Sequence, residues 1–271
     1  MLFRSRSLIA PGDLVRGDSH IETSSVSDPI LIRADGSYLY TLPSVVDDIE
    51  AGVTHIIRGE DHVTNSASQI EIFEALGGEG ASPQLGHMAL LVGADGDKLS
   101  KRLGSLSIES LRDEEGFEPM AITSLLAKIG TSDPVEVRDS VEALATEFDF
   151  SKLSRTPARF DPAELARLNA RLVHAMDYAE VKERLSDLGA DGGEAFWAAV
   201  RPNLERVRDV LEWKTLVEGP VQPVIEDADY AAAAADLLPE GEYSLETWGE
   251  WTSAIKDKTG RKGRDLFKPL R

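Results

Sequence analysis

Asp97-Lys98-Leu99-Ser100-Lys101-Arg102, read together with the upstream run Ile57-Arg58-Gly59-Glu60-Asp61-His62, is the part of this sequence that decides its fold. The basic run follows an Asp95-Gly96 turn, so it predicts a cationic loop. A lysine ammonium is a compact charge on a flexible stem, and it can meet the negative charge of a reacting polyphosphate. A solvated surface turn is an equally ordinary interpretation of the basic run taken alone.

The segments around these two runs predict a strand, a helix and a second strand. Thr54–Ile57 is a short apolar strand, a helix runs from about Ser66 to Gly77-Gly78, and Met88–Val92 is the second strand. The helix is expected to turn one apolar set inward: Ala67, Ile70, Phe73 and Leu76. This order suits half of a parallel nucleotide-binding sheet, whose ligands lie beyond the carboxyl ends of the strands. We therefore expect Arg58 and the basic loop on one side of the same crevice.

The remaining pattern predicts a hairpin before this unit and helices after it. Asp35-Gly36 is a strong turn signal between two β-prone runs, so Ile30–Arg33 and Tyr38–Leu42 are expected to form a β-hairpin. After Gly104 the apolar spacing becomes helical. Helices are expected over Pro119–Ile129, from a capping box at Asp161–Glu164 onward, and over Tyr178–Leu188, Glu194–Val217 and Asp229–Leu238. The sequence therefore predicts an α/β portion followed by an all-α remainder.

Five segments, taken in order, resemble one family. They are Asp13–Gly17 (DLVRG), Leu31–Gly36 (LIRADG), Tyr38–Asp48 (YLYTLPSVVDD), Ile57–His62 (IRGEDH) and Lys98–Arg102 (KLSKR). By these segments the chain is similar to class I glutamyl-tRNA synthetases of the bacterial type. The resemblance implies the second half of a Rossmann-like catalytic domain over residues 1–104. It further implies a helical stem-contact domain over 105–176 and part of a helical anticodon-binding domain over 177–271.

The activity implied by this resemblance is the ATP-dependent attachment of glutamate to its tRNA. The glutamate carboxylate would attack the α-phosphate of ATP and expel pyrophosphate, and the adenylate would then acylate the terminal ribose of the tRNA. ATP would arrive as its Mg²⁺ complex, because the metal shares the phosphate charge. The implied partners are L-glutamate, ATP and the glutamate tRNA, with the glutamine isoacceptor left open.

The resemblance also implies which residues meet ATP. Lys98 and Lys101 are the expected catalytic charges of the lysine loop. Contacts with ATP are expected from Lys101 itself and from Ser100, Glu60 and His87. Catalysis would consist of positioning and charge stabilisation, since phosphoryl chemistry asks little else of a protein.

The resemblance places the glutamate side chain against arginine. Arg58 follows an expected strand and can grip a carboxylate with two parallel hydrogen bonds. Tyr40 is expected to donate a hydrogen bond nearby, and Ser44 stands where many relatives carry an asparagine near the substrate. The alternative for Arg58 is a salt bridge to Glu60 or Asp61.

One signature of the family is missing. Class I synthetases hold ATP with an N-terminal H-x-G-H motif, and no histidine here is followed two residues later by Gly-His: His20, His55, His62, His87 and His174. We therefore expect a chain that begins inside its catalytic domain, also stops early, and does not aminoacylate tRNA alone. Whether Met1 is a natural start is left open. A non-catalytic tRNA-binding module from the same family is the first alternative, and an acidic helical scaffold with an incidental lysine loop is the second.

Composition bounds the partners and the compartment. The net charge is −19, from 29 basic and 48 acidic residues, which disfavours indiscriminate binding of nucleic acid. Local basic patches could still hold a tRNA, and the tail from Lys256 onward is one of them, although the residues alone favour a solvated helix end and loop. The chain has no cysteine, so it has no cysteine zinc site and suits a reducing cytoplasm. Asp61 and His62 alone do not predict a metal site, because no second pair of ligands at helical spacing accompanies them. No apolar run in the sequence is long enough to cross a bilayer.

Overall fold

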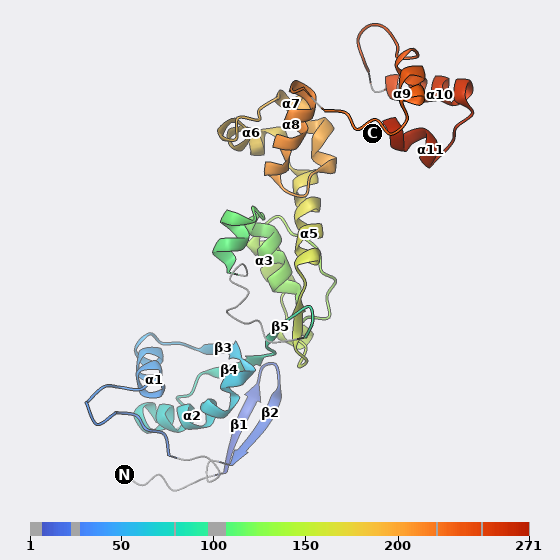
Figure 1. Ribbon diagram of the computed structural model, residues 1–271. Coiled ribbons are helices and arrows are strands. Elements are labelled where there is room, and N and C mark those ends of the chain that lie inside the picture. Colours follow the sequence, from blue (N-terminus) through green and yellow to red (C-terminus); the bar gives the residue numbers. More distant parts are fainter. Residues whose placement is uncertain are drawn as a thin grey trace. The chain divides into compact units, whose positions relative to one another are not determined.

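The computed structural model describes residues 7–22, 28–78, 80–96, 107–220, 222–244 and 246–270 (Figure 1). The chain divides into two compact units, Met1–Trp213 and Lys214–Arg271. Each unit is described below by itself. In the described ranges no helix is both long and apolar enough to cross a membrane.

A parallel strand pair forms the centre of the N-terminal α/β portion. β3 (His55–Gly59) leads through a 3₁₀ turn (Glu60–His62) into α2 (Val63–Gly77), and β4 (Gln84–Met88) returns parallel to β3. The predicted strand, helix and strand are therefore confirmed as a parallel unit. An antiparallel hairpin of β1 (Ser7–Asp13) and β2 (Gly17–Glu22), which the sequence did not reveal, lies beside β4 (Figure 1).

The second predicted strand is wrong in its extent. β4 ends at Met88, and a separate strand, β5 (Leu91–Gly93), pairs in parallel with β6 (Ala158–Phe160). The Leu90 carbonyl already accepts a hydrogen bond from the Ala158 backbone N–H at 3.1 Å. The continuous apolar run therefore changes partner midway, because its two ends meet different elements.

The hairpin predicted over Ile30–Leu42 is only partly formed. Its turn exists, with Gly36 at φ +83° and the Arg33 N–H donating to the Ser37 carbonyl at 2.8 Å. Pairing is limited to one bridge between Ile32 and Tyr38. The strand predicted to reach Leu42 is wrong, because α1 (Thr41–Glu50) begins there.

α1 and α2 pack on each other and bury a small core. Val45 of α1 is fully buried against Ile72 and Phe73 of α2, with Leu31, Leu42 and Ile56 packed around them. α2 starts three residues before the predicted position, and its predicted inward residues Ala67, Ile70 and Phe73 are buried. Leu76 was also predicted to face inward, but 57% of it is exposed in the last turn of the helix.

Helices make up the rest of the first unit. They follow a π-helical turn (Ser110–Glu114) and are α3 (Pro119–Lys128), α4 (Val141–Glu147), α5 (Pro162–Ala175), α6 (Tyr178–Asp187), α7 (Gly193–Val200) and the start of α8 (Val210–Glu218), which continues past the unit boundary at Trp213. The predictions of α3, α5 and α6 are confirmed. A single helical stretch over Glu194–Val217 is wrong, since 3₁₀ turns at Arg201–Asn203 and Val207–Asp209 separate α7 from α8. Pro202 explains the break because it has no backbone N–H to continue the helix.

The starts of α5 and α6 show how the sequence sets helix boundaries. Asp161 accepts the Ala163 N–H at 2.9 Å and so caps α5, but the contact from Glu164 that would complete the predicted capping box is not among the described hydrogen bonds. The reciprocal carboxylate contact of a capping box is found at α6, where the Asp177 N–H donates to Glu180 at 2.6 Å.

α5 joins two hydrophobic clusters. Leu165 and Leu168 pack with α3, and Val173 packs with the helices α6 to α8. The first cluster consists of Leu111, Phe117, Ala121, Ile122, Leu125, Phe160, Leu165 and Leu168. The second consists of Val173, Val181, Leu185, Ala190, Trp197, Val200, Leu204, Val207 and Val210. One helix thus serves two cores within the first unit.

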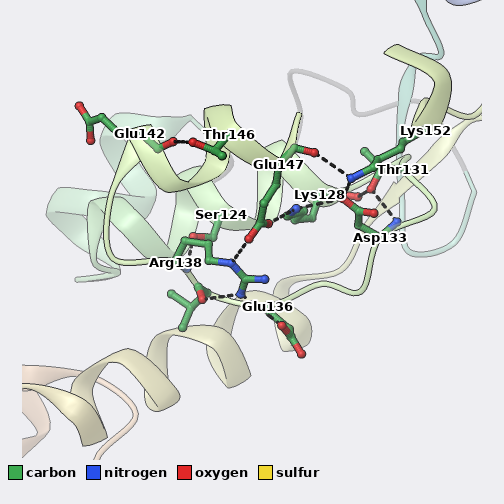
Figure 2. Close-up of polar contacts among 11 residues, drawn as sticks. Ser124, Lys128, Thr131, Asp133, Glu136, Arg138, Glu142, Thr146, Glu147 and Lys152 are labelled. Atoms are coloured by element: carbon green, nitrogen blue, oxygen red, sulfur yellow. Dashed lines mark hydrogen bonds and ion pairs between the residues drawn. The ribbon is translucent and has the colours of Figure 1, made fainter. Parts of the chain in front are cut away.

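A network of ion pairs closes the end of α3 against α4 (Figure 2). The Lys128 ammonium is buried and contacts Glu147 at 2.5 Å and Asp133 at 3.1 Å. Lys152 also binds Asp133, at 3.0 Å, and Arg138 also binds Glu147, at 2.7 Å. Hydrogen bonds from Lys152 and then Lys128 lower the pKa of Asp133, and hydrogen bonds from Arg138 and then Lys128 lower the pKa of Glu147.

The second unit is a small helical body. Its elements are α9 (Ala228–Ala235), α10 (Thr247–Thr259), α11 (Arg264–Phe267) and a 3₁₀ turn (Lys268–Leu270). Tyr230, Ala234, Ile255 and Leu266 form its core. The basic tail is more neutralised than the sequence suggested, because Arg261 binds Asp227 at 2.6 Å and Lys268 binds Glu226 at 3.1 Å. Local sequence shows only Asp257 and Asp265 as acidic neighbours of that tail.

Candidate substrate-binding site beside Arg58

Arg58 lies in β3, one residue before the strand ends, and it is directly opposite His87 of β4 in the parallel register. Its Nε donates to His87 Nε2 at 3.2 Å, and its Nη2 donates to Ser66 Oγ of α2 at 2.7 Å. The guanidinium is partly buried. Three elements thus meet at Arg58 close to the carboxyl ends of two parallel strands, the side of such sheets where ligands bind.

The state of the His87 ring follows from its neighbours. Arginine N–H groups can only donate, so His87 Nε2 must accept from Arg58. These contacts assign the ring proton to Nδ1, which lies 2.5 Å from Asp13 Oδ2. Ser66 Oγ is 2.9 Å from the same Nε2 and also 3.1 Å from the His62 carbonyl, to which its hydroxyl can donate. His87 is 2% exposed, so both ring nitrogens are satisfied inside the protein.

Asp13 is a buried carboxylate at the end of β1. Its Oδ1 accepts the backbone N–H groups of Val15 at 2.9 Å, Arg16 at 2.8 Å and His87 at 3.2 Å. Burial by itself raises the pKa of Asp13, but the hydrogen bonds from Arg16, His87 and Val15 outweigh it and leave that pKa below the ordinary value of 3.8. Asp13 is therefore ionised when it faces the Nδ1–H group of His87.

No described carboxylate forms a salt bridge with Arg58. The pKa of Arg58 is lowered from 12.5, because burial disfavours its charge, while Tyr40 first and then the carboxylates of Asp48 and Asp61 act in the opposite direction. The alternative of a salt bridge from Arg58 to Glu60 is wrong, since Glu60 binds Arg16 at 2.6 Å instead. Arg58 is thus a charged group whose described hydrogen-bond partners are the His87 imidazole and the hydroxyls of Ser66 and Tyr40.

Tyr40 and Ser44 flank this arginine with different surroundings. Tyr40 is 59% exposed, interacts with Arg58, and its ring lies 6.1 Å from that of His62. Ser44 sits in the first turn of α1, donates to the Thr41 carbonyl at 3.1 Å and accepts from Gln69 at 3.1 Å. The structure therefore brings Tyr40 to Arg58 and occupies the Ser44 hydroxyl within α1 and α2.

The structure describes only some of the residues that were predicted to bind ATP. Lys98, Ser100 and Lys101 lie outside the described residues. Glu60 is partly buried, with its Oε1 3.4 Å from the Leu90 N–H in addition to its ion pair with Arg16. Among the residues that the structure describes, no three acidic or histidine side chains converge as a metal site would require.

Sequence reasoning missed three of the residues that hold this site. Asp13 and Arg16 belong to a segment quoted only for its resemblance, and Ser66 was taken only as the start of a helix. The Asp13–His87 contact spans 74 positions, so no local pattern reveals it. The only signal in the sequence was the residue types, because Asp13 and Arg16 stand in one short motif and His87 is an isolated histidine much later in the chain.

Comparison with known proteins places this geometry in a family. The family described as "tRNA synthetases class I (E and Q), catalytic domain" matches residues 3–167. The chain is 65% identical over 259 residues to glutamate–tRNA ligase 1 of Maricaulis maris, and 59% identical over 262 residues to glutamate–tRNA ligase 2 of Hyphomonas neptunium. Each alignment covers 96% of this chain and 58% of the relative, so the chain spans less than two thirds of the relatives' length.

Solved structures agree on the fold. The crystal structure of a glutamate tRNA ligase from Elizabethkingia meningosepticum matches with a TM-score of 0.76 at 21% identity, covering 100% of this chain and 59% of that one. A glutamate–tRNA synthetase from Elizabethkingia anophelis matches with a TM-score of 0.73. The resemblance drawn from the sequence motifs is therefore confirmed, and this chain belongs to the class I tRNA synthetases of the E and Q type.

Proposed function

We propose that this chain supplies the glutamate-binding and lysine-loop part of a glutamate–tRNA ligase. The observation that carries the proposal is Arg58, a partly buried guanidinium without a described carboxylate partner at the ends of two parallel strands. A charged group in such a place needs a counter-charge, and a substrate carboxylate provides one.

Glutamate binds with its side-chain carboxylate on Arg58. Nε and one Nη2 hydrogen are used by His87 and Ser66, and the guanidinium also has a side-chain hydrogen bond with Tyr40. In this proposal the glutamate carboxylate accepts two parallel bonds from the outer edge of the guanidinium, formed by Nη1 and Nη2, where Tyr40 also binds. Tyr40 adds a hydroxyl beside this edge, and Ser44 lies farther back in α1. Glutamine would be rejected because its amide NH₂ would face the arginine donors.

The lysine loop acts on ATP. Lys101 and Ser100 contact the phosphates, and Lys98 adds a second positive charge at the start of the loop. Glu60 follows directly after β3, two residues from Arg58, and in this proposal it meets the nucleotide while its ion pair with Arg16 keeps its carboxylate in place. Magnesium enters with the polyphosphate, since this ion is held largely by phosphate oxygens and water rather than by a protein cage. The glutamate α-carboxylate then attacks the α-phosphate, and pyrophosphate leaves.

The helical segments bind tRNA. In this proposal residues 1–104 carry the catalytic half-domain, 105–176 contact the acceptor stem and 177–271 belong to the anticodon-binding region. The proposed tRNA is the glutamate isoacceptor, and extension to the glutamine isoacceptor stays a prediction from the sequence. The proposed compartment is the cytoplasm, where the aminoacylation substrates are found.

Isothermal titration with L-glutamate tests the proposal on the chain itself. We expect saturable binding of glutamate, weaker binding of glutamine, and loss of glutamate binding in Arg58→Ala. Arg33→Ala is the matched control, because Arg33 is an exposed arginine in the turn before α1. Equal binding of glutamate and glutamine, or normal binding by Arg58→Ala, would refute the assignment. Binding of tRNA with no binding of glutamate would favour the non-catalytic tRNA-binding module instead.

A further inference from the structure

Arg58 is held by a chain of hydrogen bonds that begins at Asp13. The Asp13 carboxylate faces His87 Nδ1 at 2.5 Å, and His87 Nε2 faces Arg58 Nε at 3.2 Å. Asp13 and His87 have side chains 6% and 3% exposed, so solvent does not compete for these bonds. Each of these two hydrogen bonds therefore pairs a donor with an acceptor: Asp13 Oδ2 accepts from His87 Nδ1, and His87 Nε2 accepts from Arg58 Nε.

We propose that Asp13 and His87 are positioning residues that hold the Arg58 guanidinium in the orientation that receives the glutamate side-chain carboxylate. The proposal rests on the proposed function for its ligand, and it goes further by naming the residues that set the orientation of the arginine. Asp13 fixes the proton of His87 on Nδ1, and the free lone pair of Nε2 then fixes Nε of Arg58. Ser66 fixes the neighbouring Nη2, so the guanidinium plane is set by two points.

Burial separates this role from direct contact with ATP. The His87 side chain is 3% exposed and both its nitrogens have protein partners, so its prediction as an ATP contact stays untested while its surroundings favour a positioning role. Three backbone N–H groups hold Asp13 Oδ1, and the remaining oxygen is directed to the imidazole. A carboxylate that only stabilised the turn would not need that second contact.

Asp13→Asn is the decisive substitution. Asparagine keeps an oxygen for the backbone donors, but its NH₂ group facing Nδ1 would favour the other ring tautomer. The Nε2–H group would then face the Nε–H group of Arg58, donor against donor. We expect a roughly ten-fold weaker glutamate affinity, about 1.4 kcal/mol, at unchanged overall fold. Asp18→Asn is the control, since it removes the same charge from an exposed position in the same hairpin.

Nitrogen NMR of the imidazole and guanidinium groups gives a readout that does not depend on glutamate. In the unmodified chain we expect the His87 signals of an Nδ1–H tautomer and an Arg58 Nε–H protected from exchange, with Asp13→Asn altering both. A His87 ring with its proton on Nε2 or on both nitrogens, or an Arg58 Nε–H unchanged by Asp13→Asn, would overturn the proposal. Failure of the unmodified chain to bind glutamate, with this coupling intact, would overturn only the proposed function.

A pair of His87 variants separates positioning from packing. His87→Gln offers an amide oxygen near the place of Nε2, whereas His87→Leu offers no acceptor. We expect the glutamine variant to retain more glutamate affinity and more Arg58 Nε–H protection than the leucine variant. Equal losses in both variants would mean that His87 serves only to fill space, and the proposal would fail.

Discussion

Replacing Lys128 by methionine tests the polar network that closes α3 against α4 (Figure 2). Methionine keeps most of the length and the apolar stem of the side chain, but it removes an ammonium group that is bonded to Glu147 at 2.5 Å and to Asp133 at 3.1 Å. Side-chain exposure is 5% for Lys128, against 21% for Asp133 and 34% for Glu147. The perturbation therefore deletes the most buried charge of the network.

The expected loss of stability depends on the ion pairs that are removed, on the burial cost that is avoided, and on the partners that the two carboxylates keep. Each bond to a charged partner contributes about 1.5–3 kcal/mol, while burial of an ammonium costs several kcal/mol that the apolar variant avoids. After the substitution Asp133 still binds Lys152, and Glu147 still binds Arg138, so neither carboxylate is left alone. We therefore expect a net loss of about 1–2 kcal/mol, above the ~0.2–1 kcal/mol of an exposed pair and below the ~3–5 kcal/mol of an orphaned buried charge.

Native-state hydrogen exchange of the α3 and α4 amides measures this loss locally, without requiring the whole chain to unfold in one step. Two further substitutions give a graded series, because Lys152 is 34% exposed and Arg112 pairs with Asp113 at 54% exposure. The losses should decrease from Lys128→Met to Lys152→Met to Arg112→Met. A neutral or stabilising Lys128→Met would show that desolvation exceeds the two ion pairs, and it would refute the reasoning.

Three further outcomes are expected. Arg58→Lys should narrow the preference for glutamate over glutamine in titration calorimetry, since an ammonium cannot make the two parallel bonds; an unchanged preference would place carboxylate recognition elsewhere. In a protein that contains this sequence and supports glutamate-dependent ATP–pyrophosphate exchange, Lys101→Ala should lower the rate by roughly 10²–10³, with Lys98→Ala milder; near-normal exchange would reduce Lys101 to a surface charge. Asp133 and Glu147 have lowered pKa values, so their stabilisation is complete above the ordinary values of 3.8 and 4.5 and is lost as pH falls through the folded-state values. Protection of α3 and α4 should therefore drop as pH falls below about 4.5, less so in Glu147→Gln; equal pH dependence in both proteins would count against the network.

Periodic segments were predictable from the sequence because local preference and tertiary packing agree there. α3 carries a proline at its first position and buries Ile122 and Leu125 as its spacing predicts. The parallel pair β3 and β4 follows from two apolar runs joined by a helix. In these elements the apolar residues that the periodicity places on one face are the ones that pack in the core.

Predictions failed where one stretch satisfies two patterns. Tyr38–Leu42 has the residue types of a strand, yet Leu42 and Val45 also have helical spacing, and packing against α2 selects the helix α1. Met88–Val92 is apolar throughout, so nothing in it reveals that the chain leaves β4 and joins β6. Tertiary partners decide both cases, and those partners lie far away in the sequence.

The candidate site also has one part that the sequence predicts and one part that it does not. Arg58 was predictable because its type and its place at the end of a strand are local properties. Its orientation was not, because it depends on Asp13, His87 and Ser66, which come from three different elements. A motif can therefore name a candidate binding residue, while the residues that orient its side chain are found only in three dimensions.

The turn that carries Asp13 shows why this support spans so much of the chain. Leu14 N–H donates to the Leu85 carbonyl of β4 at 2.8 Å, and Arg16 binds Glu60 just after β3. Arg155, from the segment that leads into β6, donates to the Val15 carbonyl at 3.3 Å. The turn is thus tied to both strands of the parallel pair and to the helical part of the first unit. Because Asp13 takes its position from all of these contacts, the orientation of Arg58 depends on the packing of the hairpin against β4 as much as on any bond made by Arg58 itself.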